Sequence, residues 1–124
     1  MEPIERYRGC LLGLAVGDAL GTSLEFMKPG TFELINDMQG GGFFGLEPGQ
    51  WTDDTSMALC LAESLVKKRG FDPLDQMEKY LNWYKNGHMS STGEVFDIGL
   101  TINTALVNFE RTREPYCGPT DKMS

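Results

Sequence analysis

Four oxygen-bearing side chains follow one another at the point where a glycine- and proline-rich stretch gives way to a helical pattern. They are Thr52, Asp53, Asp54 and Thr55. Inside a helix successive side chains diverge by about 100°, but at a turn that leads into a helix they can converge on one point. Hard oxygen donors with no nearby His or Cys favour Mg²⁺, Mn²⁺ or Ca²⁺ over zinc. One interpretation is therefore a hard-cation site that uses Thr52, Asp53 and Asp54.

A structural explanation of the same acids stays open. Carboxylates in the first turn of a helix interact favourably with its macrodipole and accept hydrogen bonds from unpaired backbone N–H groups. A hard cation also takes about six oxygen ligands, which is more than this segment supplies. Further ligands would come from other acids, such as Asp18, Glu25 and Asp97, although no Asp-x-Asp cluster occurs in the sequence. We therefore expect only part of a metal site here.

Helical periodicity predicts the elements that position these residues. Apolar residues recur at three- and four-residue spacing in four segments, which are residues 4–20, 53–69, 73–86 and 99–111. Asp72 and Pro73 are expected to cap and open the third helix, and a shorter helix is predicted at residues 31–37 with Thr31 as its N-cap. No segment shows the two-residue alternation of a strand. The sequence therefore predicts an all-α fold.

Glycines mark two further features. Gly9, Gly13 and Gly17 recur every fourth residue in the first predicted helix, and each costs the helix about 1 kcal/mol relative to alanine. This stripe predicts that another backbone crosses the helix closely. Residues 40–49 are rich in glycine and form a predicted loop, which lacks the Gly-Lys-Ser/Thr of a Walker loop and the preceding strand of a dinucleotide fingerprint.

Composition excludes several classes of protein. The net charge is −7 and the basic residues are scattered, which argues against binding to nucleic acid. Cys10, Cys60 and Cys117 are widely spaced, which indicates neither a disulfide framework nor a zinc site and fits a reducing cytoplasm. No apolar run is long enough to cross a bilayer, so no membrane partner is expected. The single histidine, His88, is expected to be solvated or to cap a helix end.

Four segments, in this order, resemble the N-terminal part of the ADP-ribosylglycohydrolases. They are residues 8–21, Glu25 with Phe26, residues 49–55 and residues 96–99. Members of this family remove ADP-ribose from arginine, as in dinitrogenase reductase-activating glycohydrolase, or from serine. The resemblance implies an all-α orthogonal helical bundle, in which residues 1–124 form a partial domain without its C-terminal part.

The resemblance also implies roles for individual residues. Thr52, Asp53 and Asp54 would be the N-terminal half of the ligands of a site that holds two Mg²⁺ or Mn²⁺ ions in the complete family fold. Glu25 and Asp97 would be catalytic, and Asp18 and Gly99 would bind substrate. The substrate would be an ADP-ribosylated protein or a small ADP-ribose conjugate, whose N- or O-glycosidic bond is hydrolysed.

Two later motifs of the family do not occur in these 124 residues, namely a Gly-Asn-Gly-Ser-type loop and an Asp-x-Asp-Thr metal motif. We therefore expect weak or no turnover by this chain alone. The alternative is a non-catalytic truncated homologue that binds ADP-ribose or a partner, or serves structurally. Apolar faces exposed by truncation would favour self-association.

Overall fold

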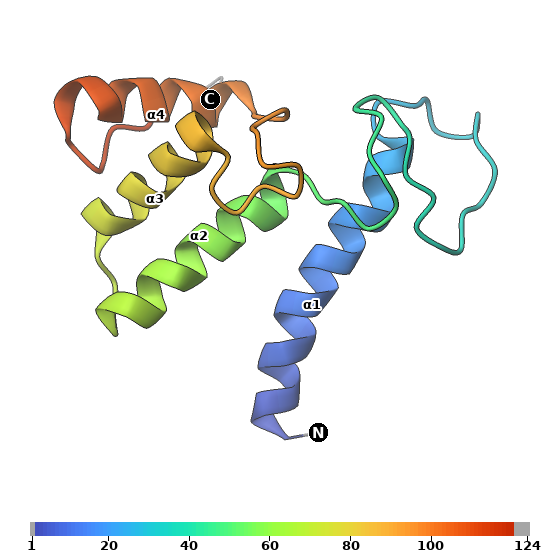
Figure 1. Cartoon of the computed structure of the whole chain (residues 1–124), viewed down its shortest axis with the longest axis horizontal. Helices are drawn as coiled ribbons and strands as arrows, with labels where there is room; N and C mark the ends of the chain where they lie inside the picture. The colour runs from blue at the N-terminus through green and yellow to red at the C-terminus, as the bar shows by residue number, and fades with distance from the viewer. Residues whose placement is uncertain (1, 121–124) are drawn as a thin grey trace. The chain divides into compact units, whose positions relative to one another are not determined.

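A computed structural model describes residues 2–120 of the chain (Figure 1). This part of the chain consists of helices joined by loops. The helices are α1 (Pro3–Gly21), the short 3₁₀ helix η1 (Thr22–Leu24), α2 (Asp53–Lys68), α3 (Pro73–Asn86) and α4 (Leu100–Thr112). Between residues 2 and 120 the only β pairing is one isolated bridge, which joins Gly41 and Leu46. The predicted all-α class is therefore confirmed. None of the helices in this range is long and apolar enough to cross a membrane.

The chain divides into two compact units, Met1–Thr55 and Ser56–Ser124. In the first unit, α1 begins with Pro3 and with a hydrogen bond from the Glu2 N–H to the Glu5 carboxylate at 3.1 Å. It ends at Gly21, one residue beyond the predicted segment, and η1 follows directly. Only Ala19 of α1 is buried, so most of this helix presents its side chains to solvent.

Two predictions for the first unit are wrong. Within this unit, nothing lies within 4 Å of a Cβ placed on Gly9, Gly13 or Gly17, so no close helix crossing forms there. Residues 31–37 contain no helix. The Thr31 hydroxyl donates to the Lys28 carbonyl oxygen at 2.6 Å, as part of a local turn. Thr31 therefore opens no helix, and no helix at residues 31–37 is present to cross α1.

The second unit is built around one buried side chain from each of its three helices. Cys60 of α2, Trp83 of α3 and Leu106 of α4 form the core, and each is at most 2% exposed. The predicted signals at the ends of α3 are confirmed, because Asp72 accepts from the Asp75 N–H at 3.0 Å and Gly87 adopts a left-handed conformation after the last turn. Helix α4 begins one residue later than predicted, at Leu100, with Gly99 as its N-cap.

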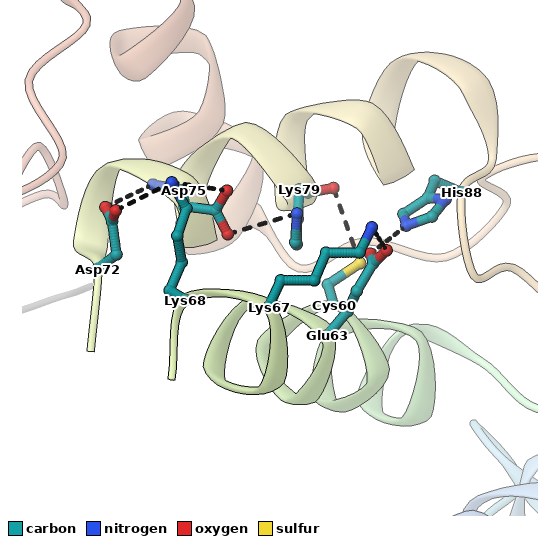
Figure 2. Close-up of polar contacts among 8 residues, drawn as sticks. All are labelled: Cys60, Glu63, Lys67, Lys68, Asp72, Asp75, Lys79 and His88. Atoms are coloured by element: carbon teal, nitrogen blue, oxygen red, sulfur yellow. Dashed lines mark hydrogen bonds and ion pairs between the residues drawn. The ribbon is translucent and has the colours of Figure 1, made fainter. Parts of the chain in front are cut away.

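Charged side chains join α2 to the region of α3 beside this core (Figure 2). Asp75 lies 3.3 Å from Lys79 and 3.7 Å from Lys68, while Glu63 pairs with Lys67 on its own helix. His88 lies 2.7 Å from Glu63 and is 30% exposed. The expectation that His88 is solvated or caps a helix is therefore corrected, because its ring contacts a carboxylate of α2.

Candidate functional site

The candidate site lies at the first turn of α2, in the N-terminal unit. Thr52 and Thr55 are buried, at 4% and 3% exposure. Asp53 and Asp54 are the acids of the first helical turn, and Asp54 is exposed. The buried hydroxyls therefore face the protein, while at least one carboxylate remains accessible to a ligand.

Asp18, from the last turn of α1, accepts hydrogen bonds from both threonines. The Thr52 N–H donates to both carboxylate oxygens at 3.1 Å, and the Thr52 hydroxyl donates to Oδ1 at 2.7 Å. The Thr55 N–H and hydroxyl donate to Oδ2 at 3.1 and 2.6 Å. Asp18 thus performs for α2 the task of an N-cap, supplying acceptors to N–H groups that have no partner within the helix.

A hollow of about 530 Å³ opens beside these residues, within the range of small-molecule binding sites. It brings Asp18 and Glu25, two of the candidate site residues, together with Thr52 and Asp54. Its lining consists of Gly13, Leu14, Gly17, Asp18, Gly21, Thr22, Leu24, Glu25, Thr52 and Asp54. Gly13, Gly17 and Gly21 of α1 form one wall, so two of the three glycines of the stripe border the candidate site.

The glycine-rich loop packs against the segment that carries Glu25. A Cβ placed on Gly42 would lie 2.8 Å from the Thr22 carbonyl oxygen, so only a glycine fits there. The rings of Phe26 and Phe43 make an edge contact with centroids 5.1 Å apart, and Phe43 contacts Phe44 at 5.2 Å. Phe26 follows Glu25 directly and has a φ of 64°. The loop and the aromatic cluster therefore fix the backbone on either side of Glu25.

Asp97 and Gly99 belong to the C-terminal unit, in the segment that leads into α4. Asp97 is half-buried, and Gly99 has an extended backbone (φ −68°, ψ 149°) at the N-cap of α4. The catalytic role of Asp97 and the substrate-binding role of Gly99 stay predictions.

The oxygen donors at the start of α2 match the preference of a hard cation only in part. Within residues 2–120, no three His, Cys, Asp or Glu side chains are grouped so as to hold a metal ion. The site does supply carboxylates and a threonine hydroxyl, which are the oxygen donors that Mg²⁺ prefers. The Thr52 proton points at Asp18, so the lone pairs of this oxygen point elsewhere. These residues therefore fit part of a magnesium site.

Comparisons with known proteins agree on one family. The family model for ADP-ribosylglycohydrolase matches residues 1–123. ADP-ribosylarginine hydrolase Tri1 of Serratia proteamaculans is 47% identical over 120 residues, which is 97% of this chain and 32% of that protein. ADP-ribosyl-[dinitrogen reductase] glycohydrolase of Rhodospirillum rubrum is 45% identical over 86 residues, which is 66% of this chain and 29% of that protein.

A solved structure described as an ADP-ribosylglycohydrolase-related protein complex superimposes with a TM-score of 0.77 at 49% identity, over 92% of this chain and 36% of the solved chain. The chain thus spans about a third of the length of the relatives it matches. The family match, the sequence identities and the shared fold together show that this chain belongs to the ADP-ribosylglycohydrolase family.

Proposed function

We propose that this chain provides the N-terminal part of a hydrolase that removes ADP-ribose from a modified acceptor, cleaving an N- or O-glycosidic bond of the arginine or serine type. The observation that carries this proposal is that Glu25, Thr52 and Asp54 line the same hollow. It combines a carboxylate on a constrained loop with hard oxygen donors at a helix start. The names of the relatives, which include ADP-ribosylarginine hydrolases, support the same reaction.

In this proposal Thr52, Asp53 and Asp54 hold Mg²⁺ or Mn²⁺. When bound, such an ion would offset the negative charge of ADP-ribose and polarise the oxygens it contacts. Glu25 moves a proton at the scissile glycosidic bond, where a positioned carboxylate is effective as an acid or base. Asp97 assists that proton transfer, and Gly99 contacts the substrate.

The side chains of Thr52, Asp53 and Asp54 supply fewer than the roughly six oxygens of a hard-cation site. The two-ion site of the complete family fold would therefore need donors from outside the described residues, and turnover by this chain alone would be weak or absent. A second candidate function is the retained binding of ADP-ribose or a partner without turnover, or a structural role. It is compatible with the same hollow, since binding a ligand there requires no complete set of metal ligands. A cytoplasmic location and self-association stay predictions.

A metal titration combined with an activity assay tests the proposal. The 124-residue chain would be titrated calorimetrically with Mn²⁺ and Mg²⁺, then incubated with ADP-ribosylated arginine and serine peptides. Asp54→Asn is expected to remove metal binding, whereas Glu25→Gln should keep metal binding and lose any turnover. Glu33→Gln removes one charge from an exposed position in the same unit and serves as the matched control. Wild-type metal binding that Asp54→Asn leaves unchanged would count against the proposed site.

A further inference from the structure

The acceptor positions of the Asp18 carboxylate are occupied by hydrogen bonds from Thr52 and Thr55. An ionised carboxylate has about four lone-pair positions, and Asp18 meets four donor groups, the N–H and the hydroxyl of Thr52 and the same two groups of Thr55. These donors come from residues 34 and 37 positions away in the sequence. The carboxylate therefore joins the last turn of α1 to the first turn of α2.

The two kinds of donor have different consequences. The N–H bonds fix the backbone of the turn that carries Asp53 and Asp54. The hydroxyl bond of Thr52 fixes the rotation of its Oγ1–H group, because the proton must point at Oδ1, 2.7 Å away. A hydroxyl oxygen whose proton is held in this way has its lone pairs in fixed directions, which preorganises it as a ligand of a hard cation.

We propose that Asp18 is a positioning residue that acts on the cation through Thr52, rather than a group that itself contacts ADP-ribose. This inference rests on the proposed function, because it assigns Thr52 to the cation. The carboxylate orients the Thr52 hydroxyl and holds the turn of Asp53 and Asp54 in place. Residues that stand behind a metal ligand and orient it typically change metal affinity by about 10- to 100-fold when altered.

Asparagine is the informative replacement for Asp18. It has nearly the same size, but its amide offers two acceptor lone pairs and an NH₂ group that can only donate. Asp18→Asn therefore leaves at least two of the four donors without an acceptor. Thr52→Val is the matching change at the ligand, because it keeps the branched shape of a buried side chain and removes the hydroxyl.

Two measurements on the full chain test the proposal. Amide hydrogen exchange at Thr52 and Thr55, recorded by NMR without metal, should be faster in Asp18→Asn than in wild type or the Glu33→Gln control. Mn²⁺ affinity, measured by electron paramagnetic resonance on variants that keep the wild-type melting temperature, should fall about 10- to 100-fold in Asp18→Asn. The loss caused by Asp18→Asn should be smaller in the Thr52→Val background than in wild type, since the two changes share the hydroxyl interaction while the N–H bonds to Asp18 are lost only with Asp18.

The outcomes separate this inference from the proposed function. Unchanged amide exchange in Asp18→Asn overturns the positioning role, whatever the metal does. A loss of affinity that is equally large in the Thr52→Val background overturns the route through Thr52, because it would be the effect of a missing charge. If wild-type protein binds no Mn²⁺, the proposed metal site fails together with the role of Asp18 toward the cation, and the amide exchange still decides whether Asp18 holds the turn.

Discussion

His88 Nε2 lies 2.7 Å from Glu63 Oε2, so the segment that follows α3 is joined to the middle of α2 (Figure 2). The Glu63 side chain is only 15% exposed and also accepts a hydrogen bond from Lys67. The hydrogen bonds from Lys67 and His88 lower the pKa of Glu63 from 4.5 to about 2, because both favour the ionised carboxylate.

This lowered pKa makes the stability of the C-terminal unit depend on pH. Because the pKa of Glu63 is lower in the folded than in the unfolded protein, its contribution is fully present above pH 4.5 and is lost as the pH falls toward 2. Glu63→Gln should lower the free energy of unfolding at pH 7 by about 1 kcal/mol, after allowance for solvent screening. The difference from wild type should shrink toward pH 2 in thermal melts followed by circular dichroism. A difference of constant size from pH 7 to 2, or an equal effect of Glu33→Gln, would contradict this.

The contact between Gly42 and η1 predicts different effects of alanine at two neighbouring glycines. Gly41 and Gly42 both have positive φ, at 74° and 69°, but only a Cβ on Gly42 meets the Thr22 and Ser23 backbone. Gly41→Ala should therefore cost about 1 kcal/mol for its left-handed conformation, and Gly42→Ala about 1–3 kcal/mol more for the clash. Hydrogen exchange at the Leu46 amide, which donates to the Gly41 carbonyl oxygen at 3.0 Å, reports on the loop. Equal effects of the two substitutions would show that the loop does not depend on this contact.

The cysteines should differ in reactivity toward an alkylating reagent. Cys60 is completely buried, and its pKa is raised to about 11, chiefly by burial. Cys10 is exposed. Since the thiolate is the reactive form, iodoacetamide at pH 8 should label Cys10 quickly and Cys60 only when the protein unfolds, as measured by peptide mass spectrometry. Rapid labelling of Cys60 in the native protein would mean that the core between α2, α3 and α4 opens readily.

Signals close together in the sequence predicted the helix ends well. The Asp72–Pro73 start of α3 and its end at Asn86 are as predicted, because the residues that cap a helix act on backbone groups a few positions away. The same local reasoning failed at Thr31, which was predicted to open a helix but forms a turn in which its hydroxyl donates to the Lys28 carbonyl oxygen. Sequence alone does not decide between a turn and a helix start when their free energies are similar.

The candidate site was predicted only in part, because its key contact is not local. The clustering of residues 52–54 predicts a group of oxygen donors but gives Thr55 no role, and the substrate-binding role of Asp18 stays a prediction. Thr52 and Thr55 lie three positions apart, a spacing that places two hydroxyls on the same side of a helix start. This spacing is the signal that could have predicted a shared acceptor, although not which acid provides it.

The position of Asp18 in α1 has a consequence for how the chain folds. A carboxylate in the last turn of a helix is unfavourable beside the negative end of that helix's macrodipole, and the last turn of α1 contains no basic residue to offset it. The same carboxylate is favourable at the positive N-terminus of α2, where it meets the donors of Thr52 and Thr55. The last turn of α1 and the first turn of α2 are therefore each more stable when the other is formed. The last turn of α1 and the first turn of α2 should form as one cooperative step, although more than thirty residues separate them in the chain.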